Sequence, residues 1–471
     1  MKKLIAIILT VCTLVLAVAC TDVDDTPTDI HTQSTHPDAM EELPIDSSID
    51  EDIKKLSITE KQEIDSLVAG SGEIVKYDMA VDSNGNFYMV LSTDKDLFKL
   101  VRKTGDGFEV LGEGAVSEYP RFKVDEYFEF GYNPNAIHLF FGEGEAPYVG
   151  ASLDGNIVIY RYDETAKKLE MVANHKLYYG EEYHSAMKRA VFDDSGRAYF
   201  EISHIPETEY YTKKEGETNV FPDGETIVFP DTEKEVIEIA IFDTKTHTFI
   251  SEVLENMKVY AVSFGYSSAE DTVYMGGEKI AVETETTSDY DSVIELYKLK
   301  LSGETITAEK VMTIAENLKN SEDFVPHLYY SFSGFKFDNE GRMYISYSAK
   351  NLYNIGGRST IYLMTLKNGE VIKEIEQEPY FYDKTRYSGT VKVAEQWFYG
   401  NQYYFIISYN DIRDYMTFGK LNLVTGEVSY VCDLDMPEHG DDYFTAVSDG
   451  TGGFHCLTTL AEGGYMYFRI S

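Results

Sequence analysis

A hairpin pattern that recurs six times is the feature that most constrains the fold of this chain. Each copy has two short runs of alternating apolar and polar residues, joined by a turn that contains Gly, Asn, Asp or Thr. The copies span residues 98–110, 159–171, 239–250, 297–306, 362–372 and 419–430. Alternation with a period of two predicts β-strands, and the recurrence of one strand unit predicts a repeat architecture.

A second turn recurs upstream of these hairpins, with Gly three residues after Asp. Its aspartates are Asp82, Asp193, Asp338 and Asp449. Such an Asp can accept hydrogen bonds from backbone amides two residues on, and the Gly supplies the positive φ of a tight turn. A calcium loop needs several converging oxygen ligands, and each copy offers one or two. We therefore predict tight turns between first and second strands, and expect the face that carries them to have little room for a site.

Together the two turn types define a four-stranded unit. The chain ends on 465–471, a third strand without a fourth, which leaves an exposed edge. The segment 73–76 is the expected donor of the closing strand. The prediction is an all-β β-propeller over residues 72–471, with seven four-stranded blades closed by an N-terminal strand and six or eight blades as alternatives. Blade two is the least defined, because residues 115–150 lack a clear turn signal.

Residues 79–89 resemble the first hairpin of bacterial β-propellers of the broad NHL-like and TolB-like kind. The resemblance implies a fold and no specific activity. Sialidase boxes and quinoprotein propellers require tryptophans, and this chain has a single Trp. The WD dipeptides of other propellers are missing as well.

The N-terminus has the features of an export signal. Lys2 and Lys3 precede an apolar run that ends at Cys20. Residues 17–20 resemble a bacterial lipobox, with Ala17 where the family usually has Leu. The resemblance implies that residues 1–19 are a lipoprotein signal peptide and that Cys20 carries the lipid, so the membrane is a partner and the protein faces the extracytoplasmic side. An uncleaved anchor or an ordinary signal peptide are the alternatives.

Two short segments separate the signal from the first blade. Residues 20–56 are rich in Asp, Glu, Thr, Ser and Pro, which predicts a disordered acidic tether. Residues 57–71 are predicted to form a short helix, capped by Thr59 with Gln62 three residues later and ended by Gly70.

Charge excludes one class of partner. The chain has 41 basic and 81 acidic residues, a formal charge of −40. Such a protein repels nucleic acid, whereas Ca²⁺ or a cationic partner remains possible. Tyrosine is unusually frequent, with 37 copies, and it is a common contact residue at binding faces.

Candidate binding residues come from loops expected on the face opposite the tight turns. Long connections span 205–234, 277–291, 349–358 and 409–416, and long loops in a compact fold are often functional. Blade-to-blade connections add polar groups near the central channel. The candidates are His184, Tyr210, Tyr211, His327, Tyr353, Arg358, Arg386, Tyr387, Arg413, Tyr415 and His439. Solvated decoration is the alternative interpretation of these loops.

The segment 433–442 is the best candidate for a metal site, although its composition favours an acidic exposed loop. Its weak Ca²⁺ candidates are Asp433, Asp435, Asp441 and Asp442. Cys432 and Cys456 lie in separate strand patterns, and either a disulfide or two buried thiols is possible.

No nucleophile elbow, phosphate loop or zinc-binding helix motif occurs in the sequence. The tether, the Tyr-rich loops and the missing motifs favour a binding or protein-interaction module that captures a glycan, peptide or protein. The alternative is a metal-assisted hydrolase or lyase, lactonase-like, with its site at the central channel mouth. A purely structural role is the third possibility.

Overall fold

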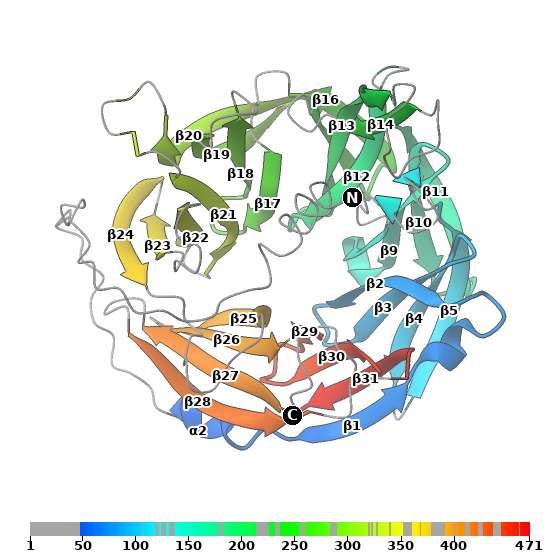
Figure 1. Cartoon of the computed structure of the whole chain (residues 1–471). Coiled ribbons are helices and arrows are strands. Elements are labelled where there is room, and N and C mark those ends of the chain that lie inside the picture. Colours follow the sequence, from blue (N-terminus) through cyan, green and yellow to red (C-terminus); the bar gives the residue numbers. More distant parts are fainter. Residues whose placement is uncertain are drawn as a thin grey trace.

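The chain folds into a closed ring of antiparallel four-stranded sheets, a β-propeller of seven blades within the described part of the chain (Figure 1). The seven-bladed prediction is therefore confirmed. The computed structural model describes residues 48–471 except 106, 118–121, 124–128, 131–136, 178–179, 181–182, 213–225, 231–235, 255–259, 283–289, 319–320, 322–323, 326–327, 339–340, 352–359, 368, 378–390, 400–401, 410–414, 423–426, 437–443 and 461.

Each blade begins next to the ring axis and steps outward strand by strand (Figure 1). The innermost strands of blades one to seven are β2 (Ile74–Val81), β8 (Ile137–Phe141), β12 (Tyr183–Phe192), β17 (Tyr260–Ser267), β21 (Leu328–Phe337), β25 (Val391–Tyr399) and β29 (Thr445–Ser448). The second strands are β3 (Phe87–Thr93), β9 (Pro147–Leu153), β13 (Arg197–Thr212), β18 (Thr272–Val282), β22 (Met343–Asn351), β26 (Gln402–Tyr409) and β30 (Phe454–Thr459).

The outer half of each blade is a hairpin, except in blade seven. The third strands are β4 (Leu97–Thr104), β10 (Asn156–Asp163), β15 (Val236–Asp243), β19 (Tyr290–Ser302), β23 (Thr360–Lys367), β27 (Tyr415–Asn422) and β31 (Tyr465–Ile470). The outermost strands are β5 (Gly107–Ala115), β11 (Lys168–Lys176), β16 (Thr248–Val253), β20 (Thr305–Asn317), β24 (Glu370–Gln377), β28 (Val428–Asp435) and β1 (Ile58–Glu63). The remaining elements are α2 (Ser48–Ile53), η1 (Asp65–Val68), η2 (Glu143–Glu145), β6 (Phe122–Lys123), β7 (Glu129–Phe130) and β14 (Thr226–Pro230).

The hydrophobic core lies in the seams between neighbouring blades. At the first seam, Val90 and Leu100 of blade one pack with Leu139 and Val149 of blade two. All four side chains are at most 2% exposed. Complete burial of an apolar side chain contributes about 1.5–3 kcal/mol, so each seam holds two blades together. Successive side chains of a strand point to opposite faces of its sheet. Each blade therefore contributes one row of side chains to the seam on either side of it.

The two predicted turn types have the expected positions. The Asp turns join the first and second strands of blades one, three, five and seven. In blade one, Asp82 Oδ1 accepts the amides of Asn84 and Asn86 at 2.9 and 2.8 Å. Gly85 has φ +80°, the left-handed conformation that the turn requires. The turn interpretation is confirmed, because the Asp side chain is consumed by backbone amides.

These turns fix the two faces of the ring. The tight-turn face carries the connections between strands one and two and between strands three and four. The long-loop face, at the opposite end of the sheets, carries the connections between strands two and three and those from blade to blade. Successive strands are antiparallel, so this division follows from the strand order.

The ring is closed by β1 and not by the predicted segment 73–76. β1 pairs antiparallel with β31, from Ile58 opposite Ile470 to Glu63 opposite Met466. The segment 73–76 instead enters β2, the innermost strand of blade one. The prediction of a closing N-terminal strand was correct, and its location was wrong by one element.

The predicted helix over 57–71 is wrong for the same reason. Residues 58–63 form β1, and only 65–68 form a short 3₁₀ helix, η1. The local signal of a helix cap at Thr59 is weak compared with the backbone hydrogen bonds that the open edge of β31 offers. Ile64 is fully buried directly after β1, so the chain is held against the ring at this point.

The end of the expected tether is also ordered. Residues 48–53 form α2, which rests on blade six. Asp50 accepts a hydrogen bond from the Tyr404 hydroxyl at 3.0 Å and forms an ion pair with Lys420. Ile53 is 6% exposed. Residues 1–47 lie outside the described residues, so the signal peptide, Cys20 and the rest of the tether remain predictions.

Tyrosine hydroxyls donate hydrogen bonds to carboxylates throughout the ring. Tyr266 donates to Asp271 at 2.9 Å, and burial together with this bond raises the pKa of Tyr266 to about 12. The other pairs are Tyr199–Asp193, Tyr274–Glu270, Tyr297–Glu295, Tyr344–Asp338, Tyr347–Glu374 and Tyr404–Asp50. A tyrosine hydroxyl donates a hydrogen bond to a carboxylate without being a cation. Such bonds can therefore satisfy carboxylates in a chain that has about twice as many acidic as basic residues.

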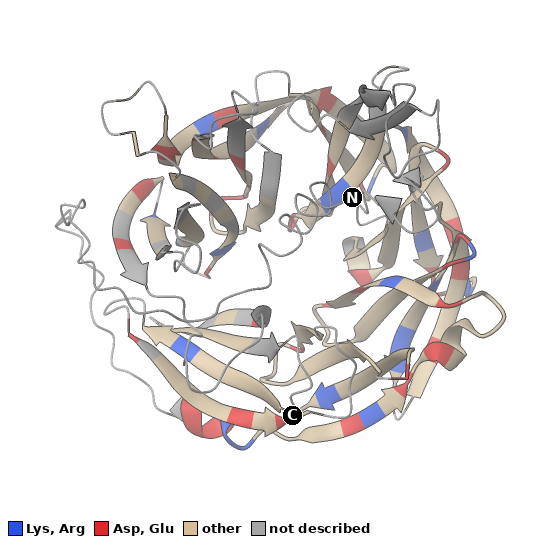
Figure 2. Cartoon of the chain, viewed as in Figure 1, with Lys and Arg blue, Asp and Glu red and all other residues tan. Residues whose placement is uncertain are grey.

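Charged side chains lie mainly toward the rim. Figure 2 shows acidic and basic segments side by side along β1, and acidic segments along β5. Among the described helices, none has the length and hydropathy of a membrane span.

Candidate functional site

The long connections that were singled out in the sequence all join strands two and three of blades three to six. They therefore leave the sheets on the long-loop face. In blade three, β13 continues beyond the sheet and pairs with β14 as a two-stranded ribbon. Blades one and two have tight turns at the equivalent place, with Asp96 and Asp154 at positive φ. The face is thus elaborated on one side of the ring.

The structure places part of the predicted binding set. Tyr210 and Tyr211 lie on β13 where it pairs with β14, and His184 lies on β12 opposite Ile205. Tyr415 begins β27, is half-buried and pairs with Asp435. The others lie outside the described residues: His327, Tyr353, Arg358, Arg386, Tyr387, Arg413 and His439.

The suggested metal segment is divided between two environments. Asp433 and Asp435 lie exposed on β28, the outermost strand of blade six, and Asp433 accepts a hydrogen bond from Thr417 at 2.7 Å. Both lie on the rim of the ring, because β28 is the outermost strand and pairs with β27. Asp441 and Asp442 lie outside the described residues. Within the described ranges, no three His, Cys, Asp or Glu side chains are grouped to hold a metal ion.

The two remaining cysteines are free thiols. Cys456 is completely buried in blade seven and Cys432 is half-buried in blade six. Burial raises the pKa of both thiols. The interpretation as unpaired thiols is confirmed, and the disulfide alternative is wrong.

A pair of titratable side chains that sequence reasoning missed lies on the innermost strands. Asp78 of β2 accepts the amide of Leu139 at 2.8 Å, and its Oδ2 lies 3.9 Å from His138 Nδ1. Although the Asp78 side chain is 35% exposed, its desolvated surroundings raise its pKa to about 6. Burial lowers the pKa of His138 to about 4. Near neutral pH the pair therefore sets a carboxylate of raised pKa beside a neutral imidazole, which makes Asp78 the candidate proton acceptor.

A second polar group runs through the seam between blades two and three. Ser185 Oγ lies 2.7 Å from His204 Nδ1, and His204 Nε2 lies 2.9 Å from Glu238 Oε2. His175 of blade two reaches the other oxygen of Glu238 at 3.0 Å. Burial opposes the charge on Glu238, but the bonds from the two histidines outweigh it and hold its pKa at about 2. Ser185 is 7% exposed and His204 is fully buried, so this chain of bonds ties two blades together.

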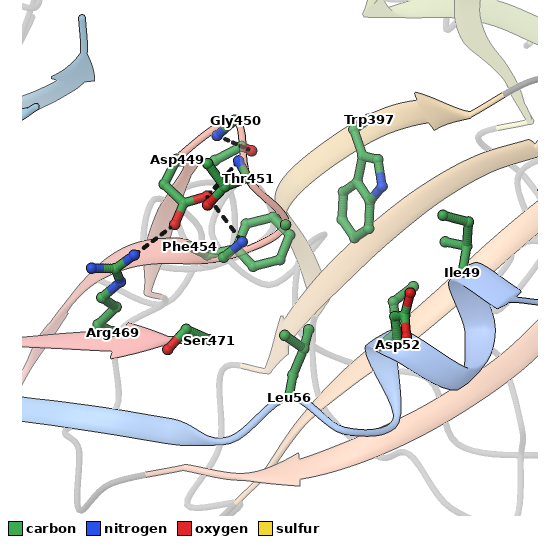
Figure 3. Close-up of a pocket in the computed structure, with 14 residues that line it drawn as sticks. Ile49, Asp52, Leu56, Trp397, Asp449, Gly450, Thr451, Phe454, Arg469 and Ser471 are labelled. Atoms are coloured by element: carbon green, nitrogen blue, oxygen red, sulfur yellow. Dashed lines mark hydrogen bonds and ion pairs between the residues drawn. The ribbon is translucent and has the colours of Figure 1, made fainter. Parts of the chain in front are cut away.

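A pocket of about 640 Å³ opens at the seam between blades six and seven, on the tight-turn face (Figure 3). Figure 3 shows Trp397 of β25 pointing into it, with Ile49, Asp52 and Leu56 of the N-terminal segment on another side. Trp397 stacks on Tyr404, with ring centroids 5.5 Å apart and planes at 13°. The stacking fixes the orientation of the indole.

The Asp turn of blade seven forms the polar wall of this pocket. Asp449 Oδ1 accepts the amides of Thr451 and Gly453 and the Thr451 hydroxyl, and its Oδ2 accepts Arg469 at 2.9 Å. Burial alone would raise the pKa of Asp449, but these donors hold it below its usual value. A Cβ added at Gly450 or Gly452 would meet no atom within 4 Å, so the main chain of the turn borders open space.

The expectation that the tight-turn face lacks room is wrong. A further pocket of about 390 Å³ lies on this face between blades three and four, beside Asp193 and Lys298. Tight turns leave the grooves between blades uncovered, and at the sixth seam α2 adds a wall. The sequence marked Asp449 through its recurring turn, but it marked neither Trp397 nor Arg469 as a site residue.

No family model matches the chain, and no curated protein matches its sequence. Solved structures align with most of its length. A protein of unknown function from Dyadobacter fermentans aligns at 9% identity and a TM-score of 0.43, covering 88% of this chain and 99% of its own. An oligogalacturonate lyase in complex with manganese aligns at 11% identity and 0.44, covering 85% and 98%. The oligogalacturonate lyase from Vibrio parahaemolyticus aligns at 11% identity and 0.42, with the same coverage of both chains.

Proposed function

We propose that this protein is a lipid-anchored, extracytoplasmic binding module that captures a glycan, peptide or protein on its long-loop face. The observation that carries the proposal is the one-sided elaboration of that face, where β13 and β14 form a ribbon beyond the sheet of blade three. Rigid sheets that present longer connections at one end are the usual arrangement of binding surfaces. Tyr210 and Tyr211 lie on this ribbon.

The decisive experiment shortens the ribbon without disturbing the blade. Thr212 and Thr226 are directly opposite each other, so an Asn-Gly turn can replace residues 213–225. Residues 48–471 are screened by thermal melting against oligosaccharides, peptides, Ca²⁺ and EDTA, because a ligand of the native state raises the midpoint. We expect the shift produced by the ligand to be lost in the shortened variant and kept in the control Asp154→Asn. A ligand that shifts both proteins equally would contradict the long-loop site.

The anchor has its own test. Full-length protein is expressed in a bacterium, labelled with palmitate and partitioned between detergent and aqueous phases. We expect label and detergent partition to depend on Cys20, so that Cys20→Ser loses both, whereas Cys12→Ser keeps both. Label retained in Cys20→Ser would contradict lipidation at this position.

The Asp78–His138 pair favours a second candidate function, a hydrolase or lyase with its site at the ring axis. Proton abstraction needs a base whose pKa lies near the operating pH, and the raised pKa of Asp78 meets this condition. A panel of lactones and acidic oligosaccharides is assayed with the native protein and with Asp78→Asn. Turnover that rises with pH through about 6 and is lost in the variant supports this function. Turnover unchanged in Asp78→Asn would remove the pair from the chemistry.

A further inference from the structure

We propose that the pocket between blades six and seven is a second binding site, on the face opposite the long loops, and that it takes a neutral saccharide ring. The site is independent of the proposed long-loop function, because no element of the ribbon borders it. Its volume of about 640 Å³ lies within the range of about 300–1,000 Å³ typical of small-molecule pockets.

The apolar side of the pocket is built from rigid parts. Trp397 is half-buried and held by Tyr404 behind it and by Phe454, whose ring centroid lies 5.1 Å away. Ile49 and Leu56 complete this side from the segment around α2. A large, fixed aromatic surface favours a flat partner with exposed C–H groups, because binding then costs little side-chain entropy.

The polar side supplies donors. One Arg469 nitrogen is bonded to Asp449, and the Arg469 side chain is 38% exposed at the pocket. The exposed part of the Arg469 side chain borders the pocket, so the further N–H groups of its guanidinium can donate to a ligand rich in acceptor oxygens. An aliphatic or aromatic peptide side chain would leave these donors unmet.

The charges at the pocket argue against an ionic ligand. Asp449 and Arg469 neutralise each other at 2.9 Å, and Asp449 also accepts the amides of Thr451 and Gly453. Asp52 is paired with Lys55 at 2.8 Å, with both side chains well exposed. A flat apolar surface opposite compensated polar groups matches a pyranose, which has an apolar face and neutral hydroxyls around its edge.

The single tryptophan makes the test direct, because all tryptophan fluorescence of this chain comes from Trp397. Residues 48–471 are titrated with maltohexaose, cellohexaose, chitohexaose and mannohexaose, and with spermine and polyglutamate as charged comparators. We expect a saturable change of emission and protection from acrylamide quenching with at least one neutral sugar. Isothermal calorimetry should give the same affinity.

Two variants show where the sugar binds. Arg469→Lys keeps a cation beside Asp449 but loses the planar set of donors, and we expect affinity to fall about tenfold, the effect of one well-placed hydrogen bond. Arg342→Lys is the matched control, since Arg342 pairs with Asp338 in the equivalent turn of blade five at 2.6 Å. If Arg469→Lys melts early, Trp397→Phe is measured by calorimetry instead, with the same expected loss.

Four results would overturn the proposal. The first is that none of the neutral sugars changes the emission or gives heat. The second is equal affinity in the native protein, Arg469→Lys and Trp397→Phe, which would place the sugar elsewhere. The third is saturable binding of spermine or polyglutamate alone, which would make the site ionic. Loss of binding in the ribbon-shortened variant but not in Arg469→Lys would support the long-loop site and reject this one.

Discussion

Blade three and blade seven have the same four-stranded sheet but are assembled differently. Blade three is built from one continuous segment and is tied to blade two by the bonds of Glu238 to His175 and His204. Blade seven takes its outermost strand, β1, from a segment that precedes blade one in the sequence. Directly after that strand, Asp65 accepts a hydrogen bond from the Tyr465 amide, 400 residues away in sequence. The entropic cost of joining distant parts of the chain into a closed ring is therefore concentrated in blade seven.

The largest effect should come from removing that closing strand. A chain of residues 64–471 lacks α2 and β1, which leaves the edge of β31 unpaired and uncovers the core around Phe454 and Phe468. We expect loss of cooperative melting, or aggregation, in circular dichroism and light scattering. Residues 48–471 are the control. A cooperative melt of residues 64–471 within a few degrees of the control would show that closure does not limit stability.

A smaller effect should follow from breaking the polar tie of blade three. Glu238→Ala removes a carboxylate that is 6% exposed and leaves two histidines without their acceptor. We expect a loss of about 3 kcal/mol in the free energy of unfolding, typical of breaking a buried ionic group, measured by urea denaturation. The control Glu309→Gln removes an exposed carboxylate and should cost less than about 0.5 kcal/mol. Equal losses in both would mean that the bonds to Glu238 contribute nothing specific.

The contacts that hold α2 against blade six extend the comparison to the blade next to the closing one. Asp50→Ala loses the bonds to Tyr404 and Lys420, both of which are largely buried partners, and should cost about 1–2 kcal/mol. Asp52→Ala, two residues away, removes only an exposed pair with Lys55 and should stay within about 0.5 kcal/mol. Denaturation of both variants is the measurement. If the denaturation midpoints of the two variants coincide, the bonds of Asp50 do not stabilise the closed ring.

Acid should weaken blade seven before blade three. Burial lowers the pKa of His455 to about 4, so its contribution to stability is complete above about pH 6.5 and is lost as the pH falls toward 4. The low pKa of Glu238 acts only below about pH 4.5. Between pH 7 and 6 we expect the advantage of the native protein over His455→Gln to shrink by about 0.7 kcal/mol. Parallel melting profiles of the two proteins across this range would contradict the assignment.

The sequence predicted those parts of the fold that depend on local chemistry. Asp82 and Gly85 make a turn wherever they fall, because the side-chain oxygen and the positive φ act within a few residues. The hairpins follow from alternation for the same reason. The identity of the closing strand depended on a sheet edge about 400 residues away in the sequence. The side chains of residues 58–63 alternate between exposed and half-buried only because this segment pairs with that edge.

The candidate site shows the same division. The long connections could be recognised because their length is visible in the sequence, and their common face followed from antiparallel order. The group of Trp397, Asp449 and Arg469 could not, because three strands from two blades and α2 meet only when the ring closes. The raised pKa of Asp78 likewise comes from burial that exists only in the assembled ring, and the bond from the Leu139 amide of the neighbouring blade opposes the rise.

The tyrosine–carboxylate hydrogen bonds have a consequence for the ionic conditions that this protein tolerates. Dissolved salt screens attraction between exposed ions, but it has little influence on a short bond between a neutral hydroxyl and a partly buried carboxylate. Tyr199 and Tyr344 hold their acidic partners in this way at 3.0 Å. A ring fastened by phenols is therefore expected to keep its shape from dilute medium to brine, where added cations also relieve the repulsion among its many acids.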